Sequence, residues 1–210
     1  MAHNPTRHIP TTALVIALSV CVWMLWNTPL PSSLPHGAYI WQREWTDGLR
    51  EAIRRNQPFV AEWVVLAAEV EFRPNAAPRV ARVAPDYASL RESQRLIGVA
   101  IRVAPWSGPF DGNRPEAKFL VQFARDILDD IRQHGIEPSQ LQLDFDAATR
   151  QLDGYRRWLD ALREAIAPTP LVFTALPTWL DSSAFSRLLP SAQAVGRQLH
   201  PLAAPRPPRP

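Results

Sequence analysis

The sequence predicts an α/β protein built from βα repeats, and three observations support this fold class. Five short β-prone runs alternate with segments in which apolar residues recur every three or four positions. The run Leu96–Val103 is nearly all apolar, as expected for a parallel strand covered on both faces. No Gly-rich phosphate loop of the G-x-G-x-x-G or G-x-x-x-x-G-K type occurs, which disfavours a nucleotide-binding sheet. Five such units form either an open doubly wound sheet or part of an eight-stranded barrel.

The predicted elements follow one another from residue 38 onward. The expected strands are Ala38–Gln42, Phe59–Phe72, Leu96–Val103, Leu141–Phe145 and Leu171–Leu176. The expected helices are one capped by Thr46, a short one within Asp86–Gln94, one that opens at Pro115 and ends at Gly135, one from Leu152 to Ile166, and a weaker one over Ser182–Leu189. A Pro-rich stretch over Pro74–Pro85 interrupts the series.

Residues 1–26 predict a signal peptide or an uncleaved signal anchor. The run Ala13–Trp26 holds 14 largely apolar residues, fewer than the roughly 20 of a spanning helix, and Arg7 precedes it. Positive charge on the amino side favours export of everything that follows. We expect the protein on the periplasmic side of the inner membrane or secreted, with residues 27–37 as a Pro-rich linker. Cleavage and retention as a membrane anchor both remain open, and the anchor is favoured.

Composition argues against several classes of function. The net charge is +3, but the excess lies near the two ends of the chain, so no basic face for nucleic acid is expected. A single cysteine, Cys21, allows no disulfide framework, and the five histidines show no metal-ligand spacing. We therefore expect no metal and no cofactor; the oligomeric state is unknown from sequence.

Carboxylates gather where the predicted strands end, which is where ligands bind in parallel α/β folds. Gln142, Asp144 and Asp146 are two residues apart and so share one strand face. Two acids in one site raise the pKa of one of them, which suits a proton donor. Asp146 is the candidate general acid, Asp144 its electrostatic neighbour and Glu69 a second carboxylate, with Glu71 on the same face as an alternative. A purely structural role, in helix capping or ion pairs with Arg102 and Arg150, is the competing interpretation.

Other side chains at the same strand ends are candidates for binding substrate. Flat aromatic faces suit sugar rings, although tryptophan is more often a packing residue. The candidates are Trp41, Gln42, Arg43, Arg102, Trp106, Gln142, Thr174 and Trp179.

Four short motifs follow one another along the chain: YIWQR at Tyr39–Arg43, VLAAE at Val65–Glu69, LQLDFD at Leu141–Asp146 and ALPTWL at Ala175–Leu180. Together they resemble the bacterial domain-of-unknown-function 3142 family. The resemblance spans Tyr39 to Leu189 and implies a glycoside-hydrolase-like (β/α) barrel, so residues 38–190 become a partial TIM-type barrel of about five units. The fourth strand is also similar to the D-x-D-x-E strand of chitinase-like hydrolases, with Asp146 in place of the glutamate and Gln142 in place of an aspartate.

The composition changes abruptly after Pro190. Five of the last ten residues are proline, so residues 191–210 are predicted to be a disordered Pro/Arg-rich tail without a strand or helix. Because a closed barrel needs roughly 200 residues or more, we expect the carboxyl half to be missing, through truncation or a frameshift. The expected function is action on, or binding of, carbohydrate; a non-catalytic envelope protein or an inactive fragment is the alternative.

Overall fold

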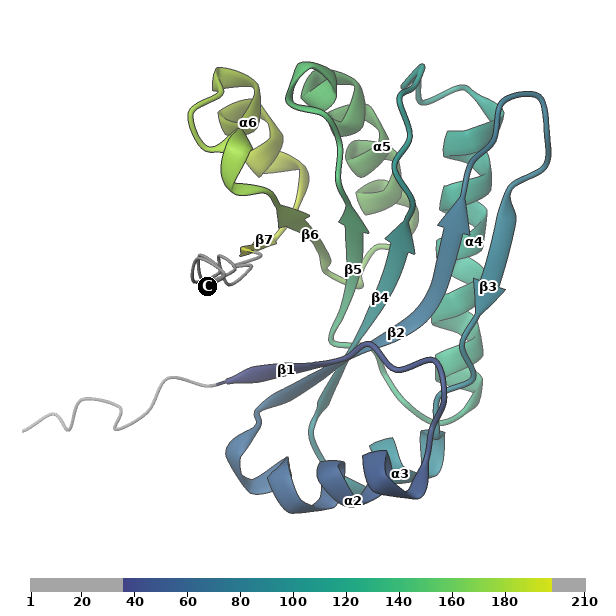
Figure 1. Cartoon of the computed structure of the whole chain (residues 1–210), viewed down its shortest axis with the longest axis vertical. Coiled ribbons are helices and arrows are strands. Elements are labelled where there is room, and N and C mark those ends of the chain that lie inside the picture. The colour runs from purple at the N-terminus through teal and green to yellow at the C-terminus, as the bar shows by residue number, and fades with distance from the viewer. Residues whose placement is uncertain (1–35, 198–210) are drawn as a thin grey trace, which may run out of the picture. The chain divides into compact units, whose positions relative to one another are not determined.

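Six parallel strands, one short antiparallel strand and five α-helices form the main elements of residues 36–197, which are the residues that this computed structural model describes (Figure 1). The parallel strands are β1 (Gly37–Ile40), β2 (Glu62–Glu71), β4 (Leu96–Val103), β5 (Gln140–Phe145), β6 (Leu171–Ala175) and β7 (Ala194–Arg197). The helices are α2 (Asp47–Asn56), α3 (Tyr87–Glu92), α4 (Pro115–Gln133), α5 (Leu152–Ala165) and α6 (Ser183–Leu188). The strand order β1-β2-β4-β5-β6-β7 follows the sequence, so the predicted partial barrel is confirmed. The hydrophobic segment predicted at residues 1–26 lies outside the described residues.

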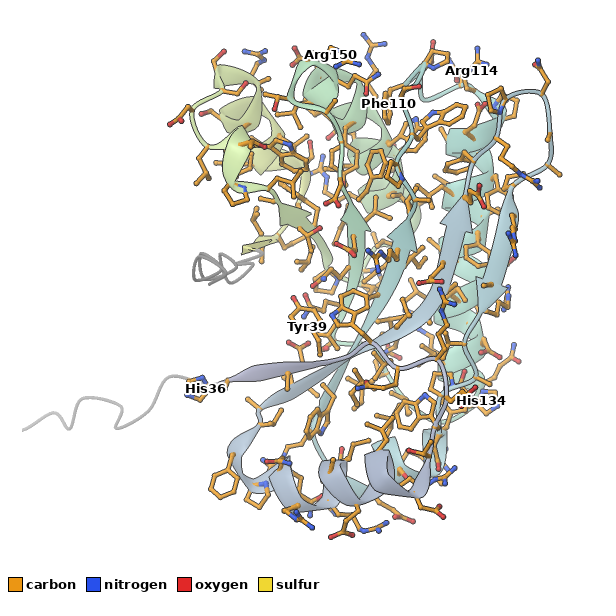
Figure 2. All side chains as sticks on the ribbon, in the orientation of Figure 1. His36, Tyr39, Phe110, Arg114, His134 and Arg150 are labelled. Carbon is orange, nitrogen blue, oxygen red and sulfur yellow. The ribbon has the colours of Figure 1, made fainter. Side chains whose placement is uncertain are left out.

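The sheet is curled rather than flat, and one side-chain contact demonstrates the curvature. Tyr39 of β1 donates a hydrogen bond from its hydroxyl to Gln142 Oε1 of β5 at 2.9 Å, across the two intervening strands β2 and β4. Figure 2 shows Tyr39 in front of the sheet, on the side opposite α4 and α5. The sheet is thus a half-barrel with an inner and an outer face.

The two faces of the sheet differ in chemistry. Outward side chains such as Val99, Ile101 and Leu143 are fully buried against the helices and belong to the main hydrophobic core. Inward side chains from the same strands include Arg102, Gln142 and Asp144. Alternation along each strand therefore separates packing from polar function, since successive side chains point to opposite faces.

Local sequence signals set the helix ends. The Thr46 side chain accepts a hydrogen bond from the Leu49 amide at 3.3 Å and Asp86 caps α3 in the same way. Helix α4 begins at Pro115, and the chain leaves it at Gly135, whose φ of 76° favours glycine. These predicted boundaries are confirmed.

Two strands were not predicted. The Pro-rich stretch contains β3 (Arg79–Arg82), which runs antiparallel to β2 and covers the part of its edge that β1 leaves free. Strand β7 pairs with β6 inside the segment predicted to be a disordered tail, so that prediction is wrong for Ala194–Arg197. The prolines that motivated it begin only at Pro201, after the strand has ended.

A close approach fixes the loop after β4 to helix α5. Phe110 from this loop is buried against Phe145 and Trp158, and a Cβ atom on Gly154 would lie 2.5 Å from the Phe110 Cβ. Figure 2 shows Phe110 beside α5. Glycine at position 154 therefore lets the loop pack directly on the helix.

We expect Gly154→Ala to lower the melting temperature, although alanine is the better helix former by about 1 kcal/mol. Overpacking costs about 1–3 kcal/mol, so a net loss of a few °C should follow. Gly48→Ala in α2 is the matched control, because a Cβ there meets no atom closer than 3.8 Å. An equal rise in melting temperature for both variants would show that the Phe110 side chain can move aside without a loss of stability.

Candidate functional site at the carboxyl ends of the strands

A row of alternating charges crosses the inner face where three strands end. Glu69 of β2 lies opposite Arg102 of β4, and Arg102 lies opposite Asp144 of β5. Neighbouring strands are about 4.8 Å apart, so each acid is within reach of the arginine between them. The predicted site residues Glu69, Arg102 and Asp144 are therefore brought together.

A β-bulge at Ala67 aims Glu69 inward. Leu66 is opposite Ala100, but Ala68 is opposite Ile101, so Ala67 is one residue too many. A bulge of this kind reverses which face the following side chains occupy. Without it, the inward alternation that includes Leu66 would continue at Ala68 instead of at Glu69. The register also distinguishes Glu69 from Glu71, because Glu69 is level with Arg102.

Asp144 is the most constrained carboxylate of the row. It is 6% exposed, its Oδ1 accepts a hydrogen bond from Thr174 Oγ1 at 2.8 Å, and its Oδ2 lies 3.7 Å from Arg102 Nε. A buried carboxylate needs such partners, since burying a charge without them is costly. Asp144 thus forms the ion pair with Arg102 that the structural interpretation expected, whereas Arg150 takes part in no ion pair within residues 36–197.

Below Asp144, Gln142 is fixed by Tyr39. Gln142 is 1% exposed, and its Nε2 has no hydrogen-bond acceptor among the described residues. Burial, more than any other influence, raises the pKa of Tyr39, so the phenol keeps the proton that it donates to Gln142. The Tyr39 ring also stacks on Trp41, with ring centroids 5.5 Å apart. Gln142, Tyr39 and Trp41 form one connected assembly at the inner face.

Asp146 follows the end of β5 and is exposed to solvent. Asp144 and Asp146 both influence Tyr155 of α5, which is fully buried. Burial raises the pKa of Tyr155 well above its ordinary value, and the charges of Asp144 and Asp146 raise it further. The charges of both acids thus act on the same buried phenol, although Asp144 itself is buried and Asp146 is exposed.

The tryptophans predicted to contact sugar have different surroundings. Trp41 is half-buried and has a face stacked on Tyr39, whereas Trp106 packs on Phe72 at the edge of the core. Trp179 is 0% exposed, and its Nε1 donates to the Ala147 carbonyl at 2.9 Å. The prediction that Trp179 contacts substrate is wrong in this structure, because its ring is a core element beside Tyr155.

A cleft of about 430 Å³ adjoins the charged row on the β2 side. It is lined by Arg43, Glu69, Val70, Glu71, Arg79, Ala81, Arg102, Ala104 and Pro105. Arg43 donates a hydrogen bond to Glu69 Oε2 and so holds that carboxylate at the cleft wall. Gln42 is exposed next to Arg43. Arg79 was not among the site residues predicted from the sequence. The signal that could have indicated it was the combination of arginine with small apolar residues in Arg79–Arg82, which is typical of a strand.

The described part of the chain offers neither a metal site nor a membrane-spanning helix. Residues 36–197 contain no group of three or more histidine, cysteine, aspartate or glutamate side chains placed to hold a metal ion. No helix within that range has the length and apolar character needed to cross a membrane.

The fold and site define the chain as an α/β protein of the (β/α)-barrel type with polar groups at the carboxyl strand ends. Residues 110–208 match the family described as Domain of unknown function (DUF3142), so the predicted resemblance is confirmed over that range. The motifs before residue 110 lie outside the match. The match continues past Leu189, where we expected the resemblance to stop, so that limit is wrong. Comparison with curated proteins gives no match.

Solved structures share this fold at low sequence identity. The catalytic domain of an endolysin from a bacteriophage of Listeria monocytogenes is 12% identical, with a TM-score of 0.53 over 75% of this chain and 71% of that one. A pyruvate carboxylase of Rhizobium etli is 15% identical, with a TM-score of 0.52 over 78% of this chain and 15% of that one. The spore cortex-lytic enzyme of Bacillus cereus is 17% identical, with a TM-score of 0.47 over 70% of this chain, which spans only 36% of that enzyme. These similarities concern the fold.

Replacing Thr174 by valine should destabilise the protein by about 1.5–3 kcal/mol, because the charged Asp144 loses a hydrogen bond while staying buried. Thr174→Ser keeps the hydroxyl and removes only a methyl group, which costs about 0.8 kcal/mol. Urea unfolding of the two variants measures the difference. If the valine variant is as stable as the wild type, Thr174 does not hold Asp144.

Proposed function

We propose that the half-barrel binds carbohydrate at the carboxyl ends of its strands and hydrolyses a glycosidic bond there. The observation that carries the proposal is the placement of a buried Asp144 and an exposed Asp146 around one strand end, beside an open cleft. The stacked pair Tyr39 and Trp41 adds an aromatic surface at the same inner face. Aromatic faces and paired carboxylates are what sugar binding and glycoside hydrolysis use.

The two acids would have different roles. Asp146, at the surface, would give its proton to the glycosidic oxygen as the carbon–oxygen bond breaks and the leaving oxygen keeps the bonding electrons. Asp144 cannot approach the substrate as freely, because Thr174 and Arg102 hold it. Its carboxylate would stabilise the positive charge that develops on the sugar ring. Water then adds to the carbon and returns a proton to Asp146.

Glu69 has a smaller part in this proposal than its sequence position implied. Its carboxylate is engaged by Arg43 and is separated from Asp144 by Arg102. Glu69 would therefore hold Arg43 in position at the cleft wall. It is still the second carboxylate of the proposed site.

Asp146→Asn should reduce hydrolysis by about 10²-fold or more, because the proton donor is lost while the shape is kept. Binding to a glycan array identifies the sugars to use, and release of reducing ends measures turnover. Asp126→Asn makes the same change on an exposed position of α4 and should leave both readouts unchanged. Unchanged turnover in Asp146→Asn would exclude this residue as the acid.

Carbohydrate binding without turnover is the second candidate function. Its support is that Asp144 and Glu69 are both engaged by arginines, as structural carboxylates are. Array binding by the wild type with no release of reducing ends would establish this alternative. No binding to any sugar would exclude both functions.

The proposal includes export, based on the apolar run Ala13–Trp26 behind Arg7. A fusion of residues 1–40 to alkaline phosphatase, which is active only outside the bacterial cytoplasm, should be active. Introducing Ile16→Arg and Val20→Arg into the run should abolish that activity. An inactive wild-type fusion that accumulates in the cytoplasm would contradict export.

A further inference from the structure

Three arginines from separate segments meet in the cleft beside the charged row. Arg43 follows β1, Arg79 belongs to β3 and Arg102 belongs to β4. Among the described residues, Glu69 and Glu71 are the acids in the lining. The lining thus carries three positive groups and two negative ones.

Strand β3 supplies Arg79 through a simple alternation. Arg79 and Ala81 line the cleft, whereas Arg82 lies over the Phe123 ring at 5.0 Å on the other side of the strand. All four residues of β3 are exposed, so the strand adds little to the core. Its effect on this face is to place a guanidinium at the cleft wall, level with Glu71 of β2.

Within residues 36–197, most N–H donors of the cleft arginines have no hydrogen-bond partner. Arg43 contacts Glu69 through one terminal nitrogen, and Arg102 approaches Asp144 through Nε at 3.7 Å. Arg79 makes no ion pair within residues 36–197. Elsewhere the pairing is fuller: Arg187 engages both oxygens of Asp153, with distances of 3.0 and 2.9 Å.

These unused donors are also accessible. The side chains of Arg43 and Arg102 are 67% and 58% exposed. A guanidinium presents several N–H groups in a plane and binds a carboxylate through two parallel hydrogen bonds. A neutral sugar hydroxyl offers no such match and no opposite charge.

We propose that this cleft recognises a carboxylate on the sugar, so that the protein selects acidic carbohydrate such as a uronic acid oligosaccharide. This inference rests on the proposed function, because it names the class of sugar bound at that site. Arg79 is the principal contact, and Arg43 and Arg102 flank it. Ala81 leaves the space between β3 and the charged row open for the ring.

The test uses the full chain and pairs of ligands that differ only in charge. Oligomers of glucuronate, galacturonate and mannuronate are compared with their methyl esters, which keep the ring and lose the negative charge. We expect at least one free acid to bind at least tenfold more tightly than its ester, and the difference to shrink as salt is raised.

Arg79→Gln should reduce that preference to threefold or less. Arg82→Gln is the control on the opposite face of β3 and should keep the preference. Ala81→Glu places a carboxylate in the cleft and should remove acid binding without touching an arginine. Circular dichroism of each variant confirms that it is folded.

The outcomes separate this inference from the proposed function. Equal binding of acid and ester, or tighter binding of sulfated oligosaccharides than of any uronate, overturns carboxylate recognition and leaves carbohydrate binding standing. A preference for the acid without turnover supports carboxylate recognition and contradicts hydrolysis. No binding to any sugar overturns both.

Discussion

The packing of the outward strand face against the helices is the constraint on which the rest of this structure depends. Leu141, Leu143 and Phe145 are buried in the same hydrophobic core as Tyr155 and Trp158 of α5, and the Phe145 ring contacts both of these rings. Each such side chain contributes about 1.5–3 kcal/mol when it leaves water. Because side chains alternate along a strand, this packing places Gln142 and Asp144 on the inner face.

The polar interior that results is stabilised by specific partners. Tyr39 reaches Gln142 across the curled sheet, and Thr174 and Arg102 contact Asp144. These bonds reduce the cost of burying polar groups, which would otherwise oppose folding. Near the strand ends the row reaches solvent, and there the charges become available to a ligand. The inward-facing positions of the strands therefore serve both purposes. Those buried within the sheet stabilise the fold, and those near the carboxyl ends of the strands are available to a ligand.

The cleft arises from two departures from the regular repeat. The bulge at Ala67 turns Glu69 inward, and β3 adds an arginine beside it where β1 has left the edge of β2. Bulges are frequent next to active sites, because they re-aim side chains. The endolysin domain and the pyruvate carboxylase share the fold, but fold alone does not define a site. In this chain the site is defined by the two irregular features, the bulge at Ala67 and the added strand β3.

The sequence by itself determined the strand–helix alternation, the helix ends and the location of Asp144 and Gln142 on one strand face. These features follow from local rules, namely capping, periodicity and alternation, which act within a few residues. Only the tertiary structure decided that Glu69 faces Arg102, that β3 carries Arg79 into a cleft, that Trp179 is a core residue and that Ala194–Arg197 is a strand. Each of these depends on pairing with a segment distant in sequence: β2 with β4, β2 with β3, Trp179 with the Ala147 carbonyl, and β7 with β6. No pattern within a single segment contains that information.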